Sequence, residues 1–80
     1  SADYLSSLFK RSMGISIVRY TNRLRIKTAK TLLSNHGVSI KEAAFSCGFS
    51  DEKYFMKVFK EQEGISPTQY KHSFGRKNIN

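Results

Sequence analysis

The sequence predicts an all-α fold, and three observations support that prediction. Apolar residues recur three and four positions apart, as on one face of a helix. The chain has five glycines, and each follows a segment with this periodicity, where helices often end. A serine stands before every such segment, where its hydroxyl can accept hydrogen bonds from the first N–H groups of a helix. No alternating strand pattern competes with these signals.

Five helices follow in order from these starts and stops. They are expected at residues 2–12, 16–34, 40–47, 51–62 and 67–73. The expected N-terminal caps are Ser1, Ser16, Ser39, Ser50 and Ser66, and the expected C-terminal glycines are Gly14, Gly37, Gly48, Gly64 and Gly75. Ser39 also forms a capping box with Glu42. Pro67 suits the first position of the last helix, where its missing N–H group costs nothing.

The first two predicted helices are amphipathic. The first has an apolar stripe made of Leu5, Leu8 and Phe9. The second is the longest, at about 27 Å, and could separate two units. Its expected apolar face is Tyr20, Leu24, Thr28 and Leu32, with Ile17 and Ala29 beside it, and its other faces bear Arg19, Arg23, Lys27 and Lys30.

Residues 38–62 form the most informative segment. A short helix with the small Ala43 and Ala44 leads through the turn 47–50 into a further helix. Helices joined by so short a glycine-containing turn cross steeply, as in a helix-turn-helix. Phe49 should fill the corner between them. The buried face of the following helix is expected to be Tyr54, Phe55, Val58 and Phe59.

The outward residues near the start of that helix are candidates for reading DNA bases. They are Glu52, Lys53, Met56 and Lys57. Lysine can donate to guanine, glutamate can accept from cytosine, and methionine can contact the methyl group of thymine. The same residues could equally form the solvated face of an ordinary helical bundle, so the pattern alone leaves both readings open.

Composition narrows the function classes. The chain has 80 residues, enough for one domain, and its 14 Lys and Arg against 6 Asp and Glu give a net charge of +8, which favours polyanions as partners. No catalytic arrangement stands out, so no enzyme is expected. Cys47 has no disulfide partner, and His36 and His72 lie far apart, so neither a metal nor a cofactor is expected. Without an apolar run of membrane-spanning length, a cytoplasmic protein is expected.

The ordered motifs then point to one family. They are Ile40-Lys41-Glu42-Ala43-Ala44, Gly48-Phe49-Ser50-Asp51, Tyr54-Phe55, Val58-Phe59-Lys60, Gly64-Ile65-Ser66-Pro67 and Tyr70-Lys71, with Leu5, Leu8-Phe9-Lys10, Gly14, Tyr20, Leu24-Arg25-Ile26, Ala29 and Leu32-Leu33 before them. Over residues 1–75 the chain resembles the DNA-binding domain of AraC/XylS bacterial transcription regulators, and the segment 48–70 is the most specific part.

The resemblance implies a homeodomain-like bundle with two helix-turn-helix units joined by a long helix. Residues 1–15 would hold the reading helix of a truncated first unit, residues 16–37 the linker helix, residues 38–75 the complete second unit, and residues 76–80 a flexible tail. The helices 2–12 and 51–62 would read successive major grooves of double-stranded DNA.

The resemblance also assigns contacts. In the first reading helix, base contacts are expected from Asp3, Ser6 and Ser7, beside the set Glu52, Lys53, Met56 and Lys57 in the second. Phosphate contacts are expected from Lys10, Arg11, Ser39, Lys60, Ser66 and Lys71. Two positions depart from the family pattern: Ala43 is smaller than usual, and Lys71 replaces a common arginine.

The chain begins at the first reading helix, so it looks like an N-terminally truncated fragment. Leu5, Leu8 and Phe9 would then lack partners and either fray or find a second chain, in a homodimer or a domain swap. RNA polymerase is another expected partner, and a nucleoid location in a bacterial cell follows from the family.

Alternatives stay open at this point. Arg25 could contact a phosphate, although an ion pair with Glu42 or Glu63 is the favoured interpretation. The chain as a whole could instead be a basic helical module that binds an acidic protein. RNA is less favoured, since the aromatic residues fall at core spacing rather than on an open platform.

Overall fold

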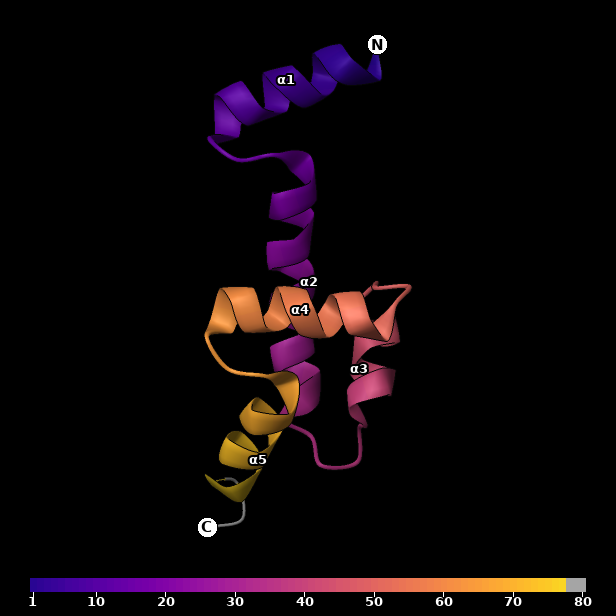
Figure 1. The fold of residues 1–80 in the computed structure, drawn as a ribbon, viewed down its shortest axis with the longest axis vertical. Helices are drawn as coiled ribbons and strands as arrows, with labels where there is room; N and C mark the ends of the chain where they lie inside the picture. Colours follow the sequence, from indigo (N-terminus) through magenta and orange to yellow (C-terminus); the bar gives the residue numbers. More distant parts are fainter. Residues whose placement is uncertain (78–80) are drawn as a thin grey trace.

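The computed structural model describes the backbone of residues 1–77 and the side chains of residues 1–73. Over this range the chain forms five helices and no strand: α1 (Ala2–Met13), α2 (Ile17–Leu33), α3 (Ile40–Ser46), α4 (Glu52–Glu63) and α5 (Pro67–Lys77). In Figure 1, α2 runs along the long axis, α1 lies across its N-terminal end, and α4 crosses its middle. The remaining helices, α3 and α5, flank the C-terminal half of α2. The all-α prediction is confirmed.

Side chains cap the helices, in most cases as predicted. The hydroxyls of Ser1, Ser16 and Ser39 accept hydrogen bonds from backbone N–H groups at 3.2, 3.1 and 3.0 Å. Ser66 does the same at 3.1 Å, and Gln69 completes a second capping box that was not predicted. The prediction for Ser50 was wrong, because α4 begins one residue later. Its cap is Asp51, whose carboxylate accepts from the N–H of Lys53 at 3.0 Å.

Two of the predicted helix ends were also wrong. Gly14 and Gly64 end α1 and α4 in the left-handed conformation, as expected. Gly37 does not end α2, which ends at Leu33 with Ser34 as its C-cap in a right-handed conformation. Its N–H instead bonds the Asn35 side chain at 2.9 Å, inside the turn that leads to α3. Gly75 ends no helix either, because α5 continues to Lys77.

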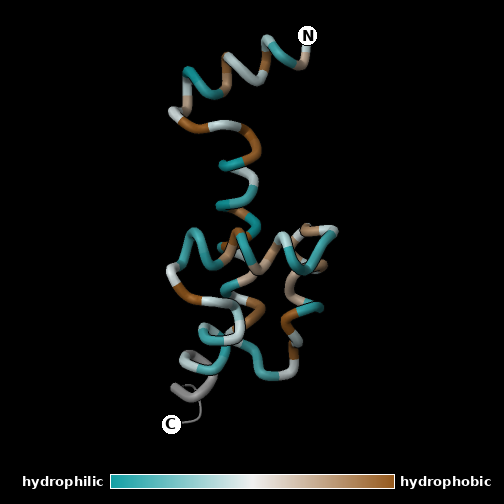
Figure 2. Tube along the Cα trace, viewed as in Figure 1, coloured by the Kyte–Doolittle hydropathy of each residue, from teal (hydrophilic) through white to brown (hydrophobic). Residues whose placement is uncertain are grey.

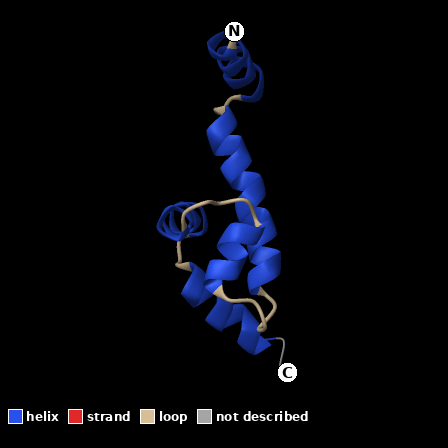
Figure 3. Ribbon diagram, turned by 90° about the vertical axis from the view of Figure 1, so that its right-hand side faces the viewer, coloured by secondary structure: helices blue, strands red, loops and turns tan. Residues whose placement is uncertain are grey.

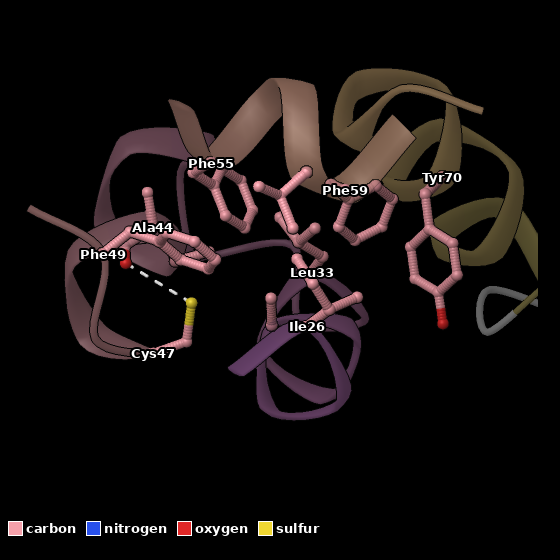
Figure 4. Packing of buried hydrophobic residues seen from close by; sticks show 11 residues of the cluster. Ile26, Leu33, Ala44, Cys47, Phe49, Phe55, Phe59 and Tyr70 are labelled. Carbon is pink, nitrogen blue, oxygen red and sulfur yellow. Dashed lines mark hydrogen bonds between the residues drawn. The ribbon is translucent and has the colours of Figure 1, made fainter. Parts of the chain in front are cut away.

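The hydrophobic core lies entirely between α2, α3, α4 and α5. Its buried members are Ile26, Ala29, Leu33, Ala43, Ala44, Cys47, Phe49, Phe55, Val58, Phe59 and Tyr70. The aromatic rings stack edge to face or tilted along α4 (Figure 4), with centroids 5.3 to 5.8 Å apart. Cys47 packs in the α3–α4 corner, where its thiol donates to the carbonyl of Ala44 at 3.3 Å. Residues far apart in sequence therefore hold α4 across α2.

The buried face of α2 differs from the predicted one. The structure buries Asn22, Ile26, Ala29 and Leu33. Of the predicted stripe, Leu24 is 51% exposed and Thr28 is exposed as well. Both stripes have helical spacing but lie on largely opposite sides of the helix, so spacing alone does not decide which of them is buried. The small side chain of Ala29 allows close packing on the stripe that is buried.

The N-terminal part of the molecule is open. No residue of α1 is buried, and its ring contact with α2 joins Phe9 to Tyr20 at 5.5 Å. Leu5 is 60% exposed and Leu8 is exposed too, as predicted, but the prediction that Phe9 lacks a partner was wrong, because its half-buried ring packs against Tyr20. Hydrophobic positions continue along α1 and the link into α2 (Figure 2), away from the core. The molecule measures 50 × 21 × 16 Å, and its radius of gyration is 14.6 Å; a compact chain of this length would have about 12 Å.

Candidate nucleic-acid interface

A tight corner joins α3 to α4. Cys47 ends α3, Gly48 turns the chain with φ of 110°, and the buried Phe49 fills the corner, where its N–H donates to the carbonyl of Ala44 at 3.0 Å. A side chain at Gly48 would be unfavourable for two reasons. The φ of 110° lies in a region that residues with a side chain rarely adopt, and the Cβ would lie 2.8 Å from Nε of Arg25. Figure 3 shows α4 end-on beside α2, held out from the long axis. This is helix-turn-helix geometry.

Arg25 is part of this corner. Its guanidinium lies over the Phe49 ring, 5.6 Å from the centroid. The predicted ion pair of Arg25 with Glu42 or Glu63 was wrong, since Glu63 pairs with Lys30 at 3.1 Å and Glu42 accepts from the N–H of Ser39. The absence of a side chain at Gly48 lets the guanidinium approach, and the ring face attracts the cation. Arg25 thus ties α2 to the turn before α4.

The outer face of α4 presents the predicted base-reading residues together. Lys53, Met56 and Lys57 are exposed, and Glu52 is half-exposed. The opposite face, with Phe55, Val58 and Phe59, is buried in the core. The helix is therefore fixed by its inner face and free to meet a partner with its outer face.

Tyr54 does not behave as predicted. The spacing placed it in the core, but it is 42% exposed. Its hydroxyl accepts a hydrogen bond of 3.0 Å from the side-chain amide of Asn22, which is only 7% exposed. The ring edge still contacts Phe49, with centroids 5.8 Å apart. This pair was not predicted from the sequence; the usable signal was a polar residue, Asn22, in helical register with Ile26 and Ala29.

Two hollows on the surface connect the predicted contact regions. A groove of about 940 Å³ lies between α2 and α4, and a smaller hollow of about 260 Å³ lies between α1 and the start of α2. Both include Ser16 and Val18, so they form one continuous surface. The charged side chains of the larger groove are Arg19, Arg23, Lys27, Lys30, Lys57, Glu61 and Glu63. Five cations against two carboxylates leave this groove positive.

The predicted contact residues of α1 fall into two groups, inside and outside the smaller hollow. Ser6, Ser7 and Lys10 line it, which brings them to the same surface as the groove. Asp3 and Arg11 are exposed elsewhere on the helix. Part of the predicted α1 contact set therefore lies on the same surface as the groove beside α4. Neither region is enclosed.

The other predicted phosphate contacts have varied surroundings. Lys60 is exposed on α4. Ser39 and Ser66 use both their hydroxyls and their backbone N–H groups in capping boxes. The half-buried Lys71 donates from its ammonium to the backbone carbonyl of Val38, which ties α5 to the loop before α3. Lys71 therefore has a structural contact that the sequence did not reveal.

Two groups have shifted acidities. The backbone N–H of Ser39, followed by its hydroxyl, lowers the pKa of the Glu42 carboxyl below its ordinary value. Burial raises the pKa of the Cys47 thiol, which keeps it protonated and unreactive at neutral pH. In the described part of the chain, no three His, Cys, Asp or Glu side chains gather closely enough to hold a metal ion. No helix there is long and apolar enough to cross a membrane.

Comparison with known proteins identifies close sequence relatives. A family model described as a helix-turn-helix domain matches residues 1–73. The chain is 38% identical over 74 residues to the HTH-type transcriptional regulator YijO of Escherichia coli, covering 92% of this chain and 26% of that protein. It is 40% identical over 75 residues to YisR of Bacillus subtilis, covering 94% and 26%. The chain spans about a quarter of the length of these curated relatives.

Solved structures agree with the sequence relatives. The C-terminal domain of the two-component response regulator yesN from Fusobacterium nucleatum superposes with a TM-score of 0.82 at 38% identity, covering 89% of this chain and 69% of that one. An AraC-type transcriptional regulator from Chromobacterium violaceum gives a TM-score of 0.77 at 28% identity, covering 92% and 66%. The likeness extends over all but a tenth of the chain in each case.

Proposed function

Since the chain belongs to the AraC-type family of helix-turn-helix transcription regulators, we propose that it binds double-stranded DNA with sequence specificity, as the DNA-reading part of a regulator. The observation that supports this most is the construction of α4. Its inner face is fixed by the buried Phe55, Val58 and Phe59, while its outer face leaves Lys53, Met56 and Lys57 free at the surface. A rigid helix with a free polar face is what insertion into a major groove requires.

The base contacts of α4 are the main source of specificity. Lys53 and Lys57 donate to O6 and N7 of guanine, Glu52 accepts from N4 of cytosine, and Met56 contacts a thymine methyl group. On α1, Asp3, Ser6 and Ser7 form the second set, which reads the next major groove along the same face of the DNA. In this arrangement residues 1–15 and 38–75 are the two reading units, and residues 16–37 connect them.

Phosphate contacts supply affinity that does not depend on sequence. The net charge of +8 attracts the duplex, and the exposed Lys10, Arg11 and Lys60 neutralise individual phosphates. Lys71 has two further N–H donors beyond its bond to Val38, and the helix N-termini at Ser39 and Ser66 attract anions through their dipoles. These contacts fix the orientation of the protein on DNA.

Further interactions would involve the full-length regulator rather than this chain alone. A sensing or dimerisation domain would supply the signal, and RNA polymerase would be the target of activation. The exposed Leu5 and Leu8 of α1 offer a surface for another copy of the chain. Because bacterial DNA lies in the nucleoid, a DNA-binding regulator would be located in the cytoplasm, at the nucleoid.

The test is fluorescence anisotropy on labelled duplexes, of random sequence and of sequences selected for tight binding. Lys57→Ala should cost about 1 to 3 kcal/mol on the selected sequence and much less on random DNA, whereas Lys10→Ala should weaken binding to all sequences alike. Equal losses on both kinds of duplex for Lys57→Ala would remove its base-reading role. A folded protein that binds no duplex at low salt would instead favour the basic protein-interaction module.

A further inference from the structure

The half of α2 between α1 and α4 is left uncovered in the fold. Figure 1 and Figure 3 both show α1 at one end of this stretch and α4 crossing at the other, with no described helix beside it. The groove of about 940 Å³ opens along it. It continues into the hollow lined by Ser6 and Ser7, so one surface runs from one proposed reading helix to the other.

The charges in this groove are unevenly distributed. At its C-terminal end, Lys30 and Glu63 neutralise each other in an ion pair of 3.1 Å. At its N-terminal end, Arg19 and Arg23 are exposed, and no carboxylate pairs with either in the described residues. They lie four residues apart, on one face of α2. An anion would therefore be attracted to the Arg19–Arg23 end of the groove.

A neutral donor stands between α2 and α4 in the same groove. The amide of Asn22 donates to the hydroxyl oxygen of Tyr54 at 3.0 Å, which fixes the position of that oxygen. Because the oxygen acts as the acceptor in this bond, the hydroxyl hydrogen is available to a further acceptor. Asn22 is 7% exposed and is held among core residues, so it can position Tyr54 rigidly.

We infer that this groove binds backbone phosphates of the DNA segment between the two reading sites, with Arg19 and Arg23 as charged donors and the Tyr54 hydroxyl as a neutral donor positioned by Asn22. The inference rests on the proposed function. Between successive major grooves on one face of a duplex lies the minor groove with its two flanking strands. A duplex contacted by α1 and α4 together presents those strands to the uncovered half of α2.

The lining of the groove favours DNA over an acidic protein. Its apolar floor, Ile26 and Val58, is almost wholly buried, and Val18 at one end is the exposed aliphatic side chain in the lining, which is a small apolar area for a protein helix to cover. Four of the eight exposed residues in the lining are cationic and one is anionic. Protein interfaces bury an apolar core, whereas duplex binding depends chiefly on neutralised phosphates.

The experiment compares salt dependence among variants of equal charge. Arg19→Gln, Arg23→Gln and the control Lys41→Gln each remove one positive charge, and Lys41 is exposed on α3 outside the groove. Binding to random and selected duplexes is measured by anisotropy over a range of salt. Each groove variant should lower the slope of log K against log salt by about 0.9, equally on both duplexes. Lys41→Gln should leave the slope nearly unchanged.

The role of the Tyr54 hydroxyl is tested by a variant that removes the hydroxyl and keeps the packing of the ring. Tyr54→Phe removes the donor but also leaves the buried Asn22 amide without its acceptor, so the double variant Asn22→Leu with Tyr54→Phe removes both polar groups. Thermal melting checks that each protein is folded. Both variants should bind random and selected duplexes about 2- to 10-fold more weakly, with an unchanged salt slope, because a neutral donor releases no counterion.

The outcomes separate this inference from the proposed function. If the wild type binds duplex but the groove variants match Lys41→Gln, the groove is not a phosphate site and the DNA-reading proposal stands. The inference is also overturned if the groove variants keep their duplex affinity and lose binding to polyglutamate, which would assign the groove to an acidic protein. A folded wild type that binds no duplex at low salt would remove both proposals.

Discussion

The two ends of α2 hold their partner helices by different means. At the C-terminal end, α4 contributes Phe55, Val58 and Phe59 to a core that also includes α3 and α5. At the N-terminal end, α1 has no buried residue and meets α2 through the Phe9–Tyr20 pair. Both helices are amphipathic and both are capped at each end. Amphipathic spacing therefore predicts that a helix forms, but not how firmly it is held.

This contrast implies graded stability along the chain. Regions with few buried apolar contacts open locally at low free energy, whereas core helices open only in global unfolding. The proposed second reading helix is held by the core, whereas the first is held only by its contacts with the start of α2. Mutations that test the two regions in parallel should therefore give unequal effects.

The largest expected difference comes from removing one aromatic ring from each region. Phe59→Ala empties a fully buried site and should lower the free energy of unfolding by about 3 to 5 kcal/mol. Phe9→Ala should cost about 1 kcal/mol, the order expected for one aromatic pair. The measurement is urea unfolding followed by circular dichroism. Phe45→Ala, at a site 47% exposed, is the matched control and should change little. Similar losses for Phe9 and Phe59 would show that α1 is anchored as firmly as α4.

A smaller difference should separate two glycines in the left-handed region. Gly48→Ala combines an unfavourable φ of 110° with a Cβ that would lie 2.8 Å from Nε of Arg25, so the guanidinium must leave Phe49. A loss of about 2 to 3 kcal/mol is expected. Gly14→Ala has a φ of 82° and no neighbour within 4 Å, so about 1 kcal/mol is expected. Thermal melts of the two variants test this order, and a larger loss at Gly14 would contradict it.

The smallest expected effect is a pH dependence of stability. It arises from Glu42 on α3, in the part of the chain that packs around the core. The N–H and hydroxyl of Ser39 lower the pKa of Glu42 in the folded state, so ionised Glu42 stabilises the fold. That stabilisation is fully present above its ordinary value of 4.5 and is lost as pH falls through the lowered folded-state pKa. Melting temperatures between pH 3 and pH 7 should show a slightly steeper acid loss in the wild type than in Glu42→Gln. Parallel curves would mean that the capping carboxylate adds nothing to stability.

Most of the fold could be predicted from the sequence because its signals are local. Four of the five predicted helix ranges end within two residues of the observed ones, since caps and glycines act on their immediate neighbours. The exceptions show where local signals fail. Asp51 and Ser50 are both good caps, and only the corner around Phe49 decides between them. The buried face of α2 depends on packing partners in α3, α4 and α5, all of which come later in the chain.

The candidate site was predictable to a similar extent. The outward residues of α4 follow from helical spacing once its core face is known, so Lys53, Met56 and Lys57 were found without the structure. Tyr54 was not, because an aromatic residue at core spacing is normally buried, and its half-exposed position results from the hydrogen bond to Asn22. The cation–π contact of Arg25 joins residues 24 positions apart and depends on the missing side chain at Gly48.

The length of α2 gives the molecule a lever. Its 17 residues extend about 25 Å, and the core grips only its C-terminal half. A tilt of about 10° about the centre of the gripped half, with an arm of about 18 Å, would move the far end by about 3 Å, close to the roughly 3.4 Å between neighbouring base pairs. The same protein could then accept two half-sites whose separation differs by one base pair, with α1 absorbing the difference while the register of α4 stays fixed.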